Sequence, residues 1–212
     1  MEIQDRLVRS QQHSQRLSPP TCIVLHTTGT SQLEKALVYY QKNRDGICPN
    51  YVVGGDGTIY RTLSDDYVAY HCGHGATGEL YQKGWAVWSR WAGKPPTELA
   101  ASYTGYAMWR ERWPGKESPL DLVTGAHPNA RSLGIEFQAS RRTLPEVFTD
   151  AQYAAGAWLV AAKAKEHGIP LDREHVIGHY DVNPVARVDS LGDKDPGRKF
   201  NWTRILDLAR AT

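Results

Sequence analysis

Cysteine is scarce in this sequence, and the three that occur, Cys22, Cys48 and Cys72, stand at irregular spacing. An odd number of unevenly spaced cysteines does not form a disulfide framework. We therefore expect each to be a small core residue in a protein that folds in a reducing compartment. The run HCGH at residues 71–74 offers three soft ligands, but the sequence has no second cluster with zinc-finger spacing to complete a metal site there.

Long hydrophobic runs are also lacking. No apolar stretch approaches the roughly 20 residues that a membrane-spanning helix needs. The first 20 residues mix charges throughout and have no apolar core of a secretory signal. These absences predict a chain without a membrane span, made in the cytoplasm without a recognisable signal peptide.

An excess of one charge is missing as well. The formal net charge is +2, and the lysines and arginines are scattered along the chain. Nucleic-acid binding needs a concentrated basic surface, so we expect no nucleic-acid partner.

The chain has the length and composition of one domain. Its 212 residues, 41% of them hydrophobic, are enough to bury one substantial core. Residues 1–20 are polar and end in Pro19-Pro20, which predicts an N-terminal arm or edge segment, and residues 21–212 form the domain itself.

Strand and helix patterns alternate along that domain. Apolar runs predict strands at residues 22–26, 132–137 and 175–179, and Asp56-Gly57 predicts a hairpin between two further strands. Capping boxes at Ser31/Glu34 and Thr149/Gln152 open helices that are expected to end near residues 44 and 168, and a last helix is expected over 202–209. We expect an α/β fold with a central mixed sheet flanked by helices.

A large aromatic-rich insertion, about residues 74–128, interrupts this pattern between two strands. It carries five of the seven tryptophans, and residues 98–113 form a possible helix within it. Two interpretations stay open: a wall that stacks on a sugar or peptide ligand, or a small satellite core that holds the insertion together.

Three side chains have the positions that a metal site needs, and a fourth is a candidate general base. His26 ends one apolar run and His179 follows another, so adjacent strands would bring the two imidazoles together, while Asp195 begins a rigid Asp-Pro-Gly turn. Glu136 interrupts the buried-type run at 132–137. A carboxylate there is costly unless it is paired, solvated or used, so it is either a general base or a residue on the polar side of the strand.

Five separated pieces of the sequence together resemble one family. The pieces are IVLHT at 23–27, NYVV with DGTIY at 50–60, YHCG at 70–73, residues 129–137, and residues 176–197 with their Gly-His and Asp-Pro-Gly signatures. Taken in this order, they make the chain similar to the zinc-dependent N-acetylmuramoyl-L-alanine amidases of the type 2 amidase fold, which include phage lysozyme-like amidases, an anhydro-muropeptide amidase and peptidoglycan recognition proteins.

The resemblance implies a role for several residues. His26, His179 and Asp195 would bind Zn²⁺, and Glu136 would be the acid–base carboxylate. His71 and Asn50 would contact substrate. Many family members carry a lysine two positions before the third ligand, where this chain has Asp193, so Lys194 is the candidate for stabilising the oxyanion.

The implied function is hydrolysis of the amide between N-acetylmuramic acid and L-alanine of peptidoglycan. The protein would be a monomer that acts on the cell wall after release or delivery. Three alternatives stay open: recycling of soluble anhydro-muropeptides in the cytoplasm, binding of peptidoglycan without catalysis, and a zinc-stabilised protein that regulates a partner enzyme.

Overall fold

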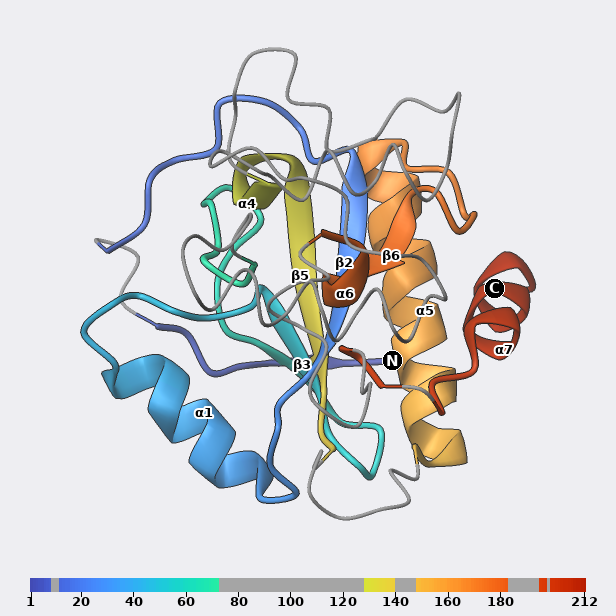
Figure 1. The fold of residues 1–212 in the computed structure, drawn as a ribbon, viewed down its shortest axis with the longest axis horizontal. Coiled ribbons are helices and arrows are strands. Elements are labelled where there is room, and N and C mark those ends of the chain that lie inside the picture. Colours follow the sequence, from blue (N-terminus) through green and yellow to red (C-terminus); the bar gives the residue numbers. More distant parts are fainter. Residues whose placement is uncertain (9–11, 73–127, 140–147, 183–194, 198) are drawn as a thin grey trace, which may run out of the picture.

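A six-stranded mixed sheet forms the centre of the molecule (Figure 1). The computed structural model describes residues 1–8, 12–72, 128–139, 148–182, 195–197 and 199–212. Among the strand pairs of this described part, the hairpin pair β3–β4 is antiparallel and the other four are parallel. In spatial order the strands are β1 (Ile3–Asp5), β4 (Ile59–Arg61), β3 (Tyr51–Val53), β5 (Ser132–Phe137), β2 (Cys22–Thr27) and β6 (Val176–Gly178). The α/β fold expected from the sequence is confirmed.

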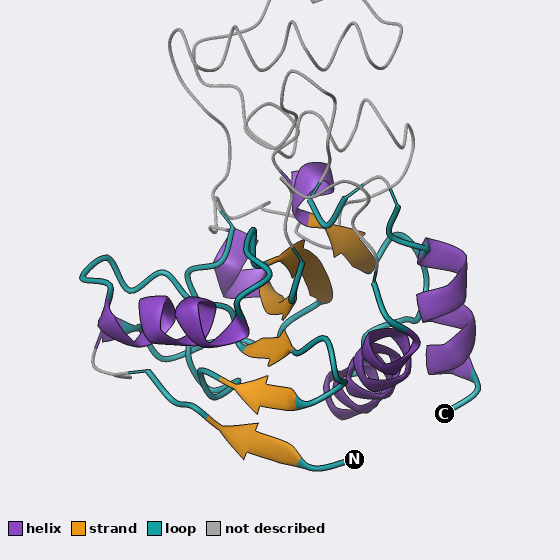
Figure 2. Cartoon of the chain, turned by 90° about the horizontal axis from the view of Figure 1, so that it is seen from below, coloured by secondary structure: helices purple, strands orange, loops and turns teal. Residues whose placement is uncertain are grey.

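Helices cover both faces of this sheet. Figures 1 and 2 show α1 (Leu33–Lys42) on one face and α5 (Asp150–His167) with α7 (Trp202–Arg210) on the other. Two short helices, α4 (Pro128–Arg131) and α6 (His179–Val182), adjoin β5 and β6. The arrangement is three layers, with the sheet between α1 and the α5–α7 pair.

Alternation along β2 divides its side chains between the two faces. Ile23 and Leu25 pack into the core beneath α5 and α7, whereas Cys22 and Val24 pack into a smaller cluster on the opposite face. Because successive side chains of a strand point to opposite faces, His26 points away from α5. All six β2 residues are buried, and the strand is an apolar run from Cys22 to Leu25 followed by His26 and Thr27.

The hairpin and the N-terminal cap of α5 are found where short sequence motifs predict them. The chain turns between β3 and β4 with Gly57 at φ 86°, a backbone angle that favours glycine. Thr149 and Gln152 form both hydrogen bonds of a capping box at the start of α5, and Gly168 ends that helix in the left-handed conformation.

The capping box predicted for α1 is wrong. The N-cap of α1 is Gln32, which makes no side-chain capping bond. The carboxylate of Glu34 instead accepts a hydrogen bond from Arg6 at 2.8 Å, a partner 28 residues away. A long-range ion pair has replaced the local cap.

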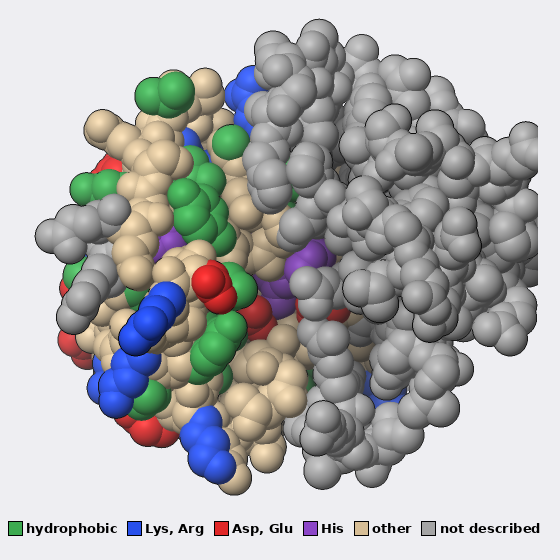
Figure 3. Space-filling model, turned by 60° about the vertical axis from the view of Figure 1, so that its left-hand side comes forward, with side chains coloured by type: hydrophobic (Ala, Val, Ile, Leu, Met, Phe, Trp, Pro, Cys, Tyr) green, Lys and Arg blue, Asp and Glu red, His purple; other side chains and the backbone are tan. Residues whose placement is uncertain are grey.

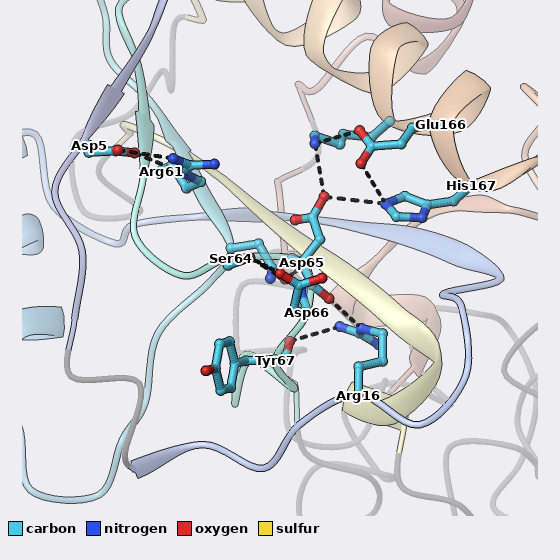
Figure 4. Close-up of polar contacts among 12 residues, drawn as sticks. Asp5, Arg16, Arg61, Ser64, Asp65, Asp66, Tyr67, Glu166 and His167 are labelled. Atoms are coloured by element: carbon cyan, nitrogen blue, oxygen red, sulfur yellow. Dashed lines mark hydrogen bonds and ion pairs between the residues drawn. The ribbon is translucent and has the colours of Figure 1, made fainter.

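The N-terminal arm is tied to the domain at two places. Its strand β1 extends the sheet beside β4, and a bidentate Asp5–Arg61 pair holds this edge (Figure 4). Further along, Arg16 donates to the backbone carbonyls of Asp65, Ala130 and Ser132 at 2.8–3.0 Å. The guanidinium thereby fixes the entry to β5.

All three cysteines are buried and free, as expected. Within the described ranges, no helix is both long and apolar enough to cross a bilayer. The aromatic insertion at 74–128, apart from its last residue, lies outside the described residues, as does the helix expected at 98–113.

Gly156 in α5 gives a test of core packing. A Cβ at this position would lie 2.4 Å from Cζ of Phe137, a fully buried ring of β5. Glycine in a helix interior costs about 1 kcal/mol relative to alanine, but overpacking a core costs about 1–3 kcal/mol. We expect Gly156→Ala to lower the free energy of unfolding by about 1 kcal/mol in urea denaturation.

Ala154→Gly is the matched control, because Ala154 is an exposed position of the same helix. It reports the intrinsic cost of glycine without the ring contact. An increase in stability of Gly156→Ala equal to that cost would show that Phe137 does not constrain this position.

Candidate metal centre and active site

Parallel pairing of β2 with β6 brings two histidines together. Leu25 pairs with Gly178, so the residues that follow, His26 and His179, are neighbours at the same edge of the sheet. Their ring centroids lie 4.6 Å apart with an interplanar angle of 76°. Each is only 1% exposed. The two imidazoles thus meet at the carboxyl ends of adjacent strands.

Asp195 completes the group from the C-terminal loop. Gly178 makes the approach possible, because a Cβ there would lie 2.7 Å from the carbonyl oxygen of Asp195. The backbone N–H of Thr27 donates to Oδ1 of Asp195 at 2.8 Å. The other oxygen, Oδ2, faces the imidazoles, at 3.5 Å from Nδ1 of His26 and 3.2 Å from Nδ1 of His179.

These three side chains fit a tetrahedral zinc ion. Zinc bonds of 2.0–2.1 Å at tetrahedral angles separate neighbouring ligand atoms by about 3.3 Å, and the two measured nitrogen–oxygen separations lie on either side of that value. All ligand atoms of the group lie within 4.8 Å of one another. Two imidazoles and one carboxylate form a donor set that zinc accepts, with a fourth position left open.

Glu136 stands beside this group. It pairs in register with His26 across β2 and β5, so the two side chains project from the same face of the sheet. Both line a cavity of about 410 Å³ with His179 and Asp195. Figure 3 shows histidine and acidic side chains gathered in a hollow of the described surface. The carboxylate is placed to exchange a proton with a group bound near the three ligands.

Helix α1 supplies a wall of the cavity that the sequence did not reveal. Tyr40 has the spacing of a core residue, and it does pack against Leu37, but it also lines the cavity with Lys35. Burial, and then the nearby Glu136 carboxylate, raise the pKa of the Tyr40 phenol, which therefore stays protonated beside Glu136. Helical periodicity alone cannot separate a residue with both roles from a purely structural one.

The two residues expected to contact substrate are placed differently. His71 lines the cavity, with Nδ1 2.9 Å from Nε2 of His26. Burial, and then the proximity of His26 and His179, hold the pKa of His71 well below its ordinary value. Asn50 is fully buried, and its Oδ1 accepts the Gly134 N–H at 3.0 Å. Asn50 braces β3 against β5 and is not among the described residues that line the cavity. Lys194 lies outside the described residues.

A second group of potential ligands lies near the N-terminal arm (Figure 4). It consists of Asp65, Glu166 and His167. The ammonium of Lys163 already contacts both carboxylates, at 2.9 Å from Asp65 and 2.8 Å from Glu166. His167 also lies 3.2 Å from Asp65. Because a lysine occupies the place that a cation would take, this group is an ion-pair network joining α5 to the loop after β4.

The fold has several similar solved structures. A mutant of PlyL superposes with a TM-score of 0.60 over the whole of both chains at 13% identity. A mutant endolysin from Bacillus subtilis gives 0.54 at 17% identity over 99% of each chain. LysC from Clostridium intestinale, an N-acetylmuramoyl-L-alanine amidase, gives 0.52 at 18% identity over 97% of this chain and 95% of LysC. At such identities these likenesses show the fold alone.

Sequence comparison identifies the family. The search among curated protein sequences found no significant match. The profile of one family, described as N-acetylmuramoyl-L-alanine amidase, matches residues 16–198, which include all five pieces of the resemblance and the four residues of the candidate site. The chain therefore belongs to the N-acetylmuramoyl-L-alanine amidase family.

Proposed function

We propose that this peptidoglycan amidase is a zinc enzyme in which His26, His179 and Asp195 hold the metal and Glu136 transfers the proton. The bond cleaved joins the lactyl carbonyl of N-acetylmuramic acid to L-alanine. The observation that carries the proposal is the convergence of two imidazoles and two carboxylates on one cavity.

Two of the three proposed ligands, Asp195 and His179, have neighbours that orient them. Thr27 N–H holds Oδ1 of Asp195, which leaves Oδ2 towards the imidazoles. At the start of α6, Asp181 accepts the N–H of Gly178 at 2.9 Å and pairs with Arg173 at 3.0 Å, which fixes the turn that presents His179. The chemistry that zinc supplies in such a set is Lewis acidity, which polarises a carbonyl and lowers the pKa of bound water to about 7.

Glu136 has the position of a general base and acid. Its carboxylate takes the proton of the attacking water and delivers it to the departing nitrogen of L-alanine, a poor leaving group until protonated. Tyr40 lies beside it in the cavity wall. Stabilisation of the oxyanion by Lys194 stays a prediction from the family resemblance, because that residue lies outside the described part of the chain.

The set of three metal ligands together with Glu136 distinguishes a catalytic amidase from a module that only binds peptidoglycan. A module that only binds peptidoglycan needs no metal with an open fourth position and no carboxylate beside it. Here the donor set and Glu136 are both present around the cavity. These residues favour the enzyme over the two non-catalytic alternatives.

Glu136→Gln tests the proton-transfer role. The amide keeps the size of the side chain but cannot take up a proton, so we expect kcat on purified peptidoglycan to fall by roughly 10²- to 10⁴-fold. Zinc content should stay at the wild-type level, because Glu136 is not one of the proposed ligands. The measurement is dye release from labelled peptidoglycan together with metal analysis.

Glu174→Gln is the matched control, since Glu174 is also partly exposed but lies away from the described lining of the cavity. It should keep wild-type turnover. Full activity of Glu136→Gln would remove Glu136 from the mechanism.

Substrate preference is a separate test. We propose that the enzyme acts on the intact wall, and an endolysin is among the proteins of similar fold. Intact sacculi and soluble anhydro-muropeptides should be digested in parallel and the products identified by mass spectrometry. We expect stem peptides with a free N-terminal L-alanine to be released from sacculi. Release from the soluble substrate alone would assign the protein to recycling instead.

A further inference from the structure

The ring of His71 is seated in a space that the sheet keeps open. A Cβ at position 134 would lie 2.5 Å from Cγ of His71, so only glycine leaves room for the imidazole. Asn50 fixes the backbone of Gly134, because the backbone N–H of Asn50 donates to the Gly134 carbonyl at 2.9 Å and its side-chain Oδ1 accepts the Gly134 N–H. On the other side, the N–H of Cys72 donates to Oδ1 of Asn129 at 2.8 Å. The position of the ring is therefore set by backbone contacts on both sides.

A serine at the start of β5 determines which nitrogen of His71 carries the proton. The hydroxyl of Ser132 donates to the Pro128 carbonyl at 2.9 Å. Nε2 of His71 lies 3.1 Å from the same hydroxyl oxygen. A serine has one hydroxyl proton, and a carbonyl can only accept, so Ser132 Oγ is left as the acceptor for His71. The proton of the His71 ring is consequently on Nε2.

The position of the proton on His71 also determines which nitrogen of His26 is protonated. A neutral imidazole with its proton on Nε2 has an acceptor at Nδ1, and Nδ1 of His71 lies 2.9 Å from Nε2 of His26. His26 must then donate from Nε2, which leaves a lone pair on its Nδ1. That Nδ1 is the atom that faces Oδ2 of Asp195 at 3.5 Å.

We propose that His71 is a positioning residue that holds His26 in the tautomer whose Nδ1 can bind the metal. The inference rests on the proposed zinc site and gives His71 a role other than the substrate contact expected from the resemblance. When one ring nitrogen of a histidine donates a hydrogen bond, the tautomer is fixed and the other nitrogen keeps a lone pair for a metal. The opposite polarity would place a proton on Nδ1 of His26, pointing at Asp195, and would leave no lone pair for the ion.

Zinc affinity measured by competition with a chromophoric chelator tests this role. Loss of the outer partner of a metal-binding histidine typically weakens metal affinity 10- to 100-fold, so His71→Ala should raise the Kd for zinc by roughly that factor. His71→Asn offers an amide oxygen near the place of Nδ1 and should recover part of the loss. His71→Leu fills a similar volume without an acceptor and should not recover the loss, whereas a purely space-filling role would let it recover at least as much as His71→Asn.

The chain contains a matched control in His13→Ala. His13 and His71 are both buried histidines with 8% exposure, but His13 contacts the Val68 carbonyl and Cys48 away from the cavity. Its removal should leave the zinc Kd unchanged. Zinc binding by His71→Ala equal to wild type, with only KM raised, would overturn the inference and restore the substrate contact. Failure of the wild-type protein to bind zinc would instead refute the proposed metal site itself.

The tautomer can also be read without any variant. Long-range ¹H–¹⁵N spectra of the metal-free wild-type protein distinguish protonation at Nδ1 from protonation at Nε2. We expect the protons of both His26 and His71 on Nε2. A proton on Nδ1 of His26 would contradict the relay even if every His71 variant failed to fold.

Discussion

The pairing of β2 with parallel neighbours on both sides is the constraint on which the site depends. β5 and β6 flank this strand, and the register places Glu136 opposite His26 on one side and His179 next to it on the other. Parallel strands bring their carboxyl ends to one edge of a sheet. Three groups that are more than 40 residues apart in sequence therefore reach one cavity without any local motif between them. A slip of one residue in β2 would turn His26 towards the core beneath α5.

Glycines allow the remaining parts to approach this edge. Gly178 admits the Asp195 loop against β6, and Gly134 admits the ring of His71 against β5. Each position would otherwise place a Cβ within 3 Å of another heavy atom. Asp195, the proposed third ligand, and His71, the proposed outer partner of His26, thus both lie against strand positions that lack a side chain. A buried carboxylate is costly unless it is paired, and Oδ1 of Asp195 accepts the Thr27 N–H, while its Oδ2 faces the two imidazoles.

Much of the fold could be predicted because its signals are local. The β-rich runs, the Asp56-Gly57 hairpin and the capping box at Thr149 depend on residues within a few positions of one another, and the structure contains all three. The predicted cap of α1 is absent, and Glu34 instead pairs with Arg6, a partner that no sequence window around the helix contains. The candidate ligands were found from strand ends together with the family resemblance.

The sequence alone could not show whether a side chain such as Tyr40 or Asn50 packs in the core, lines the cavity or does both. Tyr40 has core spacing, yet it reaches the cavity because α1 lies over the face that carries Glu136. Asn50 directly precedes β3, and its side-chain Oδ1 accepts the Gly134 N–H of the neighbouring strand β5. Such outcomes depend on the packing of elements distant in sequence, which periodicity does not encode.

The central claim is that His26, His179 and Asp195 form one zinc site. Anomalous diffraction from crystals of the protein purified with zinc, recorded on both sides of the zinc absorption edge, tests it most directly. The account predicts a single strong anomalous difference peak within bonding distance of Nδ1 of His26, Nδ1 of His179 and Oδ2 of Asp195. This peak should be absent from crystals of Asp195→Ala. A zinc-replete protein without a peak at these three atoms, or with the metal at Asp65, Glu166 and His167, would contradict it.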